Sequence, residues 1–147
     1  MTRTASRDFT SAWETFFRTS RRLRARAGRL PFEGLSLAQY QLLEALRHTP
    51  ELTVGELAES AGVAPPTATR MLDCLARDGL VSRRHSEEDR RAVLVSLTGE
   101  GTTVLAAAHE EVEAFRRRMF ASLTGEEREQ ATRLLNRLTR VLEDNLP

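Results

Sequence analysis

The stretch HSEEDRRAVLVSLTGEG, residues 85–101, combines acidic and basic residues with an alternating apolar run and a Thr-x-x-Gly end. Val93, Val95 and Leu97 occupy every second position, which is the period of a strand with one buried face. Residues 80–84 and 92–97 therefore predict two strands, with the polar loop HSEEDR between them. We expect a β-hairpin that carries both signs of charge at its tip.

Two helical segments precede this hairpin. LTVGELAESAGV, residues 52–63, predicts a short helix closed by a glycine. APPTATRMLDCLARDGL, residues 64–80, predicts another helix, with Pro65 and Pro66 in its first turn, where missing N–H groups cost little, and Gly79 just past its end. A helix, a glycine turn, a helix and a hairpin together predict a winged helix-turn-helix.

The helix over 64–80 has two distinct faces at 100° per residue. One arc is apolar, must pack on the preceding helix, and consists of Ala68, Met71, Leu72 and Leu75. The opposite arc consists of Pro66, Arg70, Asp73 and Arg77, flanked by Thr69 and Cys74. Such a polar, basic and short-chained surface suits the major groove of DNA, where Arg70 and Thr69 could meet base edges. A merely solvated helix face is the alternative.

Amphipathic helices are also predicted toward both ends of the chain. A first helix ends near 28–31 and carries the stripe Phe9, Trp13, Phe16, Ser20, Leu23, Ala27 and Leu30. Ser36 is a candidate N-cap for a second helix that extends to about His48. A long helix begins at Gly101, and the capping box of Thr124 and Glu127 opens the last one. That last helix carries the stripe Ala131, Leu134, Leu135, Leu138, Val141 and Leu142. A compact winged core cannot bury both stripes, so pairing of two chains through the terminal helices is expected.

Bulk composition limits the classes of protein that remain. The 147 residues fit one domain, and their 40% hydrophobic content includes no apolar run long enough to span a membrane. The first residues lack the apolar core of a secretory signal, and Cys74 is the single cysteine, so a reducing cytoplasm is the expected compartment. The net charge of +1 conceals segregation, because residues 1–30 hold eight arginines against two acidic residues.

The segment DRRAVLVSLTGEG resembles the D-x-R-x(5)-LT-x-x-G signature of the MarR family of winged helix-turn-helix transcriptional regulators. Asp89, Arg91, Leu97, Thr98 and Gly101 occupy the signature positions. TRMLDCLARDGLV, residues 69–81, is similar to the recognition helix and following strand of that family.

The resemblance implies a mainly α fold with a small β-hairpin wing (α+β). Residues 1–147 would form a single domain of this kind. Its winged helix-turn-helix core would span 36–100, and its dimerisation helices would span 1–32 and 101–147.

The function implied by the resemblance is that of a sequence-specific, DNA-binding transcriptional regulator. It would be a homodimeric repressor that binds double-stranded DNA at a pseudopalindromic operator and is released or tuned by a small-molecule effector. The candidate DNA-binding residues are Thr67, Thr69, Arg70, Arg77, Arg84, Arg90 and Arg91. By similarity, Arg91 would be the groove contact at the wing tip.

Acidic residues beside these arginines have a structural explanation. A flexible arginine loses rotamer entropy when it is fixed on DNA, and a neighbouring carboxylate can hold it beforehand. By resemblance, Asp89 and Asp73 would brace Arg91 and Arg83, linking the recognition helix to the wing. The alternative is an exposed salt-bridge cluster worth less than about 1 kcal/mol per pair.

An effector pocket between the terminal helices and the winged core is a further implication of the resemblance. Trp13, Phe17 and Tyr40 are its aromatic candidates, and His109 is a possible polar end, so the effector would be a small aromatic or anionic molecule. Packing in the hydrophobic core is the alternative role for each of these residues.

Other chemistry has weak support in the sequence. His109 and Glu113 are spaced as two metal ligands on a helix, but such a pair is more often plain surface. Cys74 has no second cysteine to resolve a sulfenate, which favours an inert thiol. No nucleophile elbow or phosphate loop occurs, so we expect neither an enzyme nor a cofactor. The alternative function is a helical dimer whose winged domain binds protein and not DNA.

Overall fold

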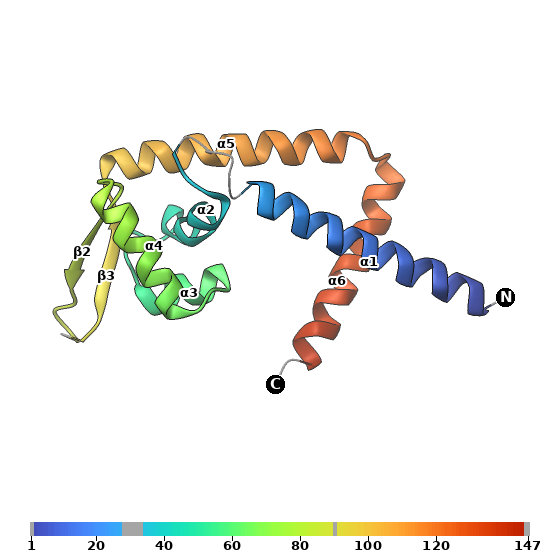
Figure 1. Ribbon diagram of the computed structural model, residues 1–147, viewed down its shortest axis with the longest axis horizontal. Coiled ribbons are helices and arrows are strands. Elements are labelled where there is room, and N and C mark those ends of the chain that lie inside the picture. The colour runs from blue at the N-terminus through green and yellow to red at the C-terminus, as the bar shows by residue number, and fades with distance from the viewer. Residues whose placement is uncertain (1, 28–33, 90, 146–147) are drawn as a thin grey trace. The chain divides into compact units, whose positions relative to one another are not determined.

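The computed structural model describes residues 2–27, 34–89 and 91–145 of the chain. Two compact units make up the fold, Met1–His109 and Glu110–Pro147, and the boundary between them falls inside a long helix. The N-terminal unit contains the helix-turn-helix and the sheet, and the C-terminal unit contains the last helix (Figure 1).

Helix α1, Thr2–Ala27, confirms the predicted first helix, and its expected end near 28–31 lies outside the described residues. Its side chains are described from 8 to 23, and most of them are exposed. Phe9 is 60% exposed and Phe16 is 62% exposed, although both belong to the predicted apolar stripe. The described part of the stripe therefore has little cover within the N-terminal unit.

Helix α2, Leu37–Leu43, continues into the short 3₁₀ helix η1, Glu44–Arg47. Ser36 caps α2 as predicted, because its hydroxyl accepts from the Gln39 N–H at 3.2 Å while the Gln39 side chain accepts from the Ser36 N–H at 2.9 Å. The predicted end near His48 is confirmed, with a last turn tighter than an α-helix. Buried Leu42, Leu43 and Leu46 anchor this segment in the core.

Helices α3, Val54–Ala61, and α4, Pro65–Arg77, form the helix-turn-helix. Gly62 closes α3 at φ +63°, and Gly79 follows α4 at φ +75°, both in the left-handed region that favours glycine. Leu72 and Leu75 are fully buried on the predicted apolar arc of α4, and the core continues through Leu57 of α3. Periodicity therefore predicted the inward face of α4 correctly.

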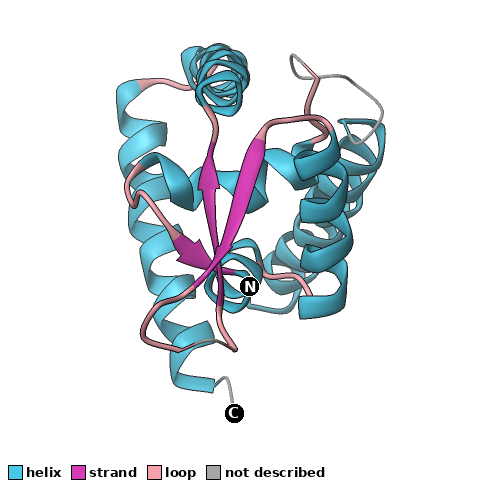
Figure 2. Cartoon of the chain, turned by 90° about the vertical axis from the view of Figure 1, so that its left-hand side faces the viewer, coloured by secondary structure: helices cyan, strands magenta, loops and turns pink. Residues whose placement is uncertain are grey.

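The sheet has three antiparallel strands in the order β1-β3-β2 (Figure 2). Strands β2, Val81–His85, and β3, Val93–Leu97, confirm the predicted hairpin, with buried Val95 in its centre. Strand β1, Leu52–Thr53, was assigned to a helix from the sequence, and this assignment was wrong. Thr53 instead ends the strand and caps α3, because its hydroxyl accepts from the Glu56 N–H at 3.2 Å.

Two long helices complete the chain, α5 over Gly99–Ala121 and α6 over Gly125–Asn145. The predicted capping box at α6 is present, with the Thr124 N–H donating to Glu127 at 2.7 Å and the Glu127 N–H donating back at 3.2 Å. No residue of α6 as described is buried. Within the described ranges, none of the helices combines the length and apolarity that a bilayer crossing requires.

The first turn of α5 packs directly against the start of β2. A Cβ atom added at Gly101 would lie 1.8 Å from the main-chain oxygen of Leu80, far inside van der Waals contact. The Gly101 N–H also donates to the Thr98 hydroxyl at 3.0 Å, and that hydroxyl donates to the Gly79 carbonyl at 2.6 Å. A side chain at position 101 would force these segments apart.

We expect Gly101→Ala to lower the free energy of unfolding by about 3 kcal/mol, because the backbone has to shift to relieve the overlap with Leu80. Urea denaturation followed by circular dichroism measures this change. Gly99→Ala is the control, since nothing lies within 4 Å of a Cβ at that position. It should be neutral or stabilise by no more than about 1 kcal/mol. Equal stability of the two variants would contradict the packing constraint.

Candidate nucleic-acid interface

The outward face of α4 is polar, basic and exposed, as its periodicity predicted. The exposed residues on this face include Thr67, Thr69, Arg70 and Arg77. The Thr69 hydroxyl donates to the Pro65 carbonyl at 3.0 Å, one turn back along the helix. Arg77 is also engaged, since its Nη2 donates to Cys74 Sγ at 3.1 Å and its Nε to the Asp73 carbonyl at 3.4 Å.

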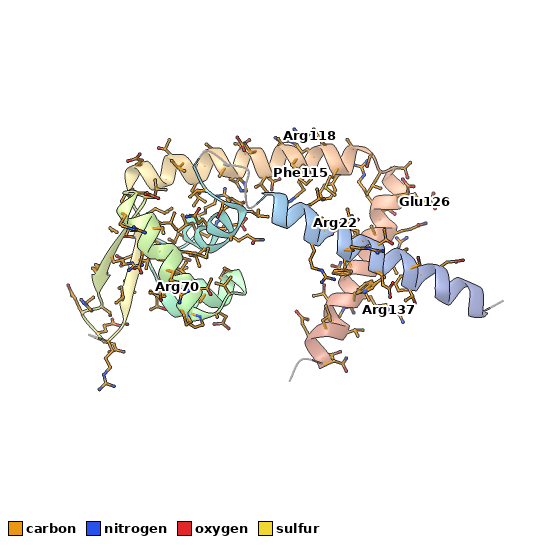
Figure 3. All side chains as sticks on the ribbon, viewed as in Figure 1. Arg22, Arg70, Phe115, Arg118, Glu126 and Arg137 are labelled. Atoms are coloured by element: carbon orange, nitrogen blue, oxygen red, sulfur yellow. The ribbon has the colours of Figure 1, made fainter. Side chains whose placement is uncertain are left out.

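Of the guanidinium groups that the structure describes on α4 and at the hairpin tip, two are uncommitted. Among the described residues, neither Arg70 of α4 nor Arg91 at the wing loop has a side-chain ion pair or hydrogen bond. Arg70 is labelled on α4 in Figure 3. Together, β2, β3 and the loop 86–92 that joins them form the wing. Each free guanidinium can meet a phosphate or a base edge without first breaking a contact.

The N-terminus of α4 itself has few donors for an anion. Its N-cap Ala64 has no side-chain cap, and Pro65 and Pro66 carry no N–H group. The next amide, of Thr67, donates to the Ala64 carbonyl at 2.9 Å. Contacts from this end of the helix to a polyanion therefore depend on side chains.

An ion pair links α4 to the wing. Arg83 Nη1 of β2 lies 2.6 Å from Asp73 Oδ1 of α4, and Arg83 Nη2 donates to the Thr69 carbonyl at 3.3 Å. The family resemblance implied this pair of Asp73 and Arg83 as a brace between the recognition helix and the wing. Their side chains are 52% and 27% exposed, respectively, so the pair orients the two elements more than it stabilises them.

Side chains of the wing loop hold the main chain of the same loop. The Ser86 hydroxyl accepts from the N–H groups of Glu88 and Asp89, and Asp89 Oδ1 accepts from the main-chain N–H of Arg91 at 2.9 Å. The expected brace from Asp89 to Arg91 thus acts on the backbone of Arg91 and leaves its guanidinium available. Arg90, the neighbouring candidate contact, lies outside the described residues.

Arg84 forms an ion pair, unlike the other candidate contacts that the structure describes. Its Nε donates to Glu51 Oε1 at 2.8 Å, and its Nη2 pairs with Glu51 Oε2, which results in a two-point contact. These hydrogen bonds hold the pKa of the Glu51 carboxyl below its usual value, and the same contact raises the pKa of Arg84. No local pattern pointed to Glu51, because 33 positions separate it from Arg84.

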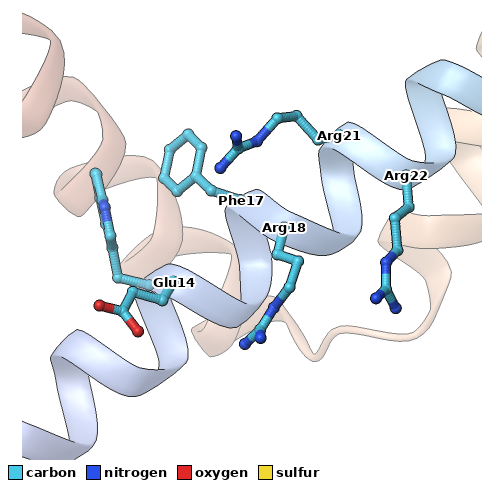
Figure 4. A pocket seen from close by; sticks show the side chains of 6 residues that line it. Glu14, Phe17, Arg18, Arg21 and Arg22 are labelled. Atoms are coloured by element: carbon cyan, nitrogen blue, oxygen red, sulfur yellow. The ribbon is translucent and has the colours of Figure 1, made fainter.

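The residues proposed for an effector pocket form two separate groups. Trp13 and Phe17 on α1 have ring centroids 4.5 Å apart and line an open groove of about 590 Å³. The other lining residues are Glu14, Arg18, Arg21 and Arg22, all on α1 (Figure 4).

The second group contains Tyr40 of α2 and His109 of α5. The hydroxyl of the nearly inaccessible Tyr40 lies 3.0 Å from Glu44 Oε1 and 2.9 Å from His109 Nδ1, and it can donate its single proton to only one of them. Arg47 Nη1 also approaches that nitrogen to 2.9 Å. Arginine cannot accept a hydrogen bond, so this contact needs the lone pair of Nδ1, with the ring proton on Nε2. Glu44 and Arg47 were not identified from the sequence. The described residues contain no cluster of three or more potential metal ligands.

Comparison with known proteins identifies relatives of this fold. The MarR family model matches residues 35–93, which include α2, the helix-turn-helix and most of the wing. The uncharacterized HTH-type transcriptional regulator YdgJ of Bacillus subtilis is 33% identical over 105 residues, covering 71% of this chain and 64% of YdgJ. The HTH-type transcriptional repressor MdtR of B. subtilis is 33% identical over 111 residues, covering 76% of this chain and 72% of MdtR.

The fold also matches a solved DNA complex. A crystal structure of a mutant of MarR from Escherichia coli, complexed with operator DNA, has a TM-score of 0.69 and 28% sequence identity. The match covers 84% of this chain and 93% of that one. The chain therefore shares its fold with a protein whose structure was solved in complex with operator DNA.

We expect Asp73→Asn to loosen the wing without unfolding the protein. The exposed pair with Arg83 contributes less than about 1 kcal/mol, so global stability should fall by no more than that. Amide hydrogen exchange in β2 should accelerate by up to about fivefold relative to α4, because the wing loses one of its contacts with that helix. Asp78→Asn, which also removes an acid at the end of α4, is the control. Identical exchange in the two variants would contradict a bracing role.

Proposed function

Because the chain belongs to the MarR family, we propose that it is a homodimeric, sequence-specific DNA-binding transcriptional regulator that represses by occupying its operator. The observation that supports this most directly is the pair of uncommitted guanidinium groups, Arg70 on the outward face of α4 and Arg91 at the wing. Arg70 would meet a base edge in the major groove, and Arg91 would enter the minor groove or bind phosphate. The proposal includes no catalytic step.

The other candidate contacts would have supporting roles. Thr67, Thr69 and Arg77 would line the same groove on either side of Arg70. Arg90 would join Arg91 at the wing loop. Asp73 and Asp89 would hold the wing in its DNA-binding geometry, through the Arg83 side chain and the Arg91 main chain, respectively.

A second copy of the chain is the partner that would cover the exposed apolar helices. In the N-terminal unit the uncovered side chains include Phe9, Phe16 and Leu23 of α1. In the C-terminal unit they include Phe115, Met119 and Phe120 of α5 and Leu134, Leu135, Val141 and Leu142 of α6. Burying these in a two-fold dimer would place two α4 helices on one duplex, at half-sites about 34–36 Å apart.

A small aromatic anion is the proposed effector. Trp13 and Phe17 would stack on its ring, and the arginines of the groove on α1 would pair with its charge. Figure 4 shows Arg21 extending toward the Phe17 ring. The effector would release DNA only by binding more tightly to the dimer arrangement that does not fit the operator.

The competing proposal is that the chain forms a helical dimer whose winged domain binds protein and not DNA. We do not favour it, because the relative in the solved operator complex uses this fold on DNA. We also propose a cytoplasmic location, because a transcriptional regulator shares a compartment with the chromosome and the relatives named above are bacterial. Selection of genomic fragments by the purified protein, followed by sequencing of the retained DNA, tests the proposal. A monomer that retains no duplex at low ionic strength would refute it.

We expect Arg70→Ala to relax base discrimination. Loss of a two-point contact with one base should cost about 1–3 kcal/mol on the preferred site, while sites altered at that base pair lose little. Competition binding against a panel of single-base operator variants measures this. Arg140→Ala on α6, outside the helix-turn-helix and the wing, is the control. Equal weakening on all sequences would instead assign Arg70 to a phosphate.

We expect Arg91→Ala to reduce the salt dependence of binding. Removal of one phosphate contact should flatten the slope of log affinity against log salt by about 0.9, with little change in sequence preference. Fluorescence anisotropy on specific and non-specific duplexes at several salt concentrations measures the slope. An unchanged slope would exclude Arg91 from the backbone interface.

A further inference from the structure

The contact between Glu51 and Arg84 crosses the sheet. Thr53 of β1 and Arg84 of β2 both pair with Leu94 of β3, so the Arg84 side chain passes over the central strand to reach the residue two positions before Thr53. Alternation along β2 places Arg83 on the face that carries buried Val95, and Arg84 on the opposite face. Two adjacent arginines are thus held on opposite faces by different acidic residues.

The carboxylate of Glu51 occupies the edge of Arg84 that would otherwise bind a phosphate. Arginine binds planar and tetrahedral oxyanions through two neighbouring N–H groups, and Glu51 takes such a pair, Nε and Nη2. The hydrogen bonds from Arg84 lower the pKa of Glu51 and so favour its ionised form. Glu87 of the wing loop adds a weaker attraction for the same guanidinium.

Solvent reaches this pair, so it can exchange partners. The side chains of Arg84 and Glu51 are 52% and 32% exposed, respectively, and exposed ion pairs of this kind are only weakly held. A phosphodiester offers Arg84 the same contact that Glu51 does. Arg84 lies immediately before the last residue of β2, next to the wing loop that carries Arg91.

We infer that Glu51 competes with the DNA backbone for Arg84, so that Arg84 becomes a phosphate contact only by leaving Glu51. This inference rests on the proposed function. It identifies Glu51 as a residue that limits the strength of sequence-independent DNA binding. Arg70 and Arg91 bind without such competition. Arg84 adds its contact only where the backbone comes close enough to displace the carboxylate.

The test is a double-mutant comparison on a non-specific duplex, with affinity measured by fluorescence anisotropy over a series of salt concentrations. The proteins are the wild type, Glu51→Gln, Arg84→Gln and the double variant. Glu59→Gln on α3 removes the same charge from the same unit outside this pair and serves as the matched control. Circular dichroism and thermal unfolding establish that each variant is folded, and the change from glutamate to glutamine preserves the size and shape of the side chain.

We expect Glu51→Gln to bind several-fold more tightly than Glu59→Gln at low salt, and to steepen the slope of log affinity against log salt by about 0.9. Arg84→Gln and the double variant should bind alike, because Glu51 acts only through Arg84. A purely structural role for Glu51 would change thermal stability and leave the salt slope unaltered.

Three outcomes would overturn the inference alone, with wild-type DNA binding intact. The first is the same affinity and slope for Glu51→Gln and Glu59→Gln. The second is an effect of Glu51→Gln that persists in the Arg84→Gln background. The third is weaker binding by Glu51→Gln, which would make Glu51 a support for Arg84 and not its competitor. Failure of the wild type to bind any duplex would instead reject the proposed function, and this inference with it.

Discussion

The main-chain oxygen of Leu80 and the hydroxyl of Thr98 join the segments on which the DNA-binding part of the fold depends. The Leu80 carbonyl accepts from the Thr98 N–H at 3.1 Å, the Leu80 N–H donates to the Leu75 carbonyl at 2.9 Å, and the Thr98 hydroxyl bridges Gly79 and Gly101. The end of α4, both wing strands and the first turn of α5 therefore meet at one point. Glycine is required at position 101 because backbone passes where a Cβ atom would lie. The LT-x-x-G part of the MarR signature thus has a packing explanation in this chain.

With α4 and the wing fixed in this way, the arginines differ in how they are engaged. Arg70 and Arg91 are uncommitted among the described residues, Arg83 is tied to Asp73, and Arg84 is tied to Glu51. The near-neutral net charge of +1 is compatible with DNA binding because positive charge is presented locally, while acidic residues neutralise selected arginines. Binding strength would then depend on which guanidinium groups are free, and not on how many arginines the chain contains.

The remaining helices carry many hydrophobic side chains that are not buried. The core consists of residues from Leu35 to Ala108, whereas aromatic and aliphatic side chains of α1, the end of α5 and α6 stay exposed. Large exposed apolar surfaces are characteristic of interfaces with other molecules. The same segments were predicted from the sequence as dimerisation helices, which remains a proposal for this chain.

The sequence by itself determined the helices, several of their caps and the inward face of α4, because these depend on residues within three or four positions of one another. It missed Thr53 as the cap of α3. Ser36, Thr124, Gly62 and Gly79 all act where local pattern places them. Tertiary structure alone decided the two-residue strand β1, which is too short to show any period and which pairs with Leu94 and Val95 of β3. It also decided which acid each arginine meets and which residues surround His109, since those partners lie 10 to 69 positions apart and are brought together only when the sheet and helices pack.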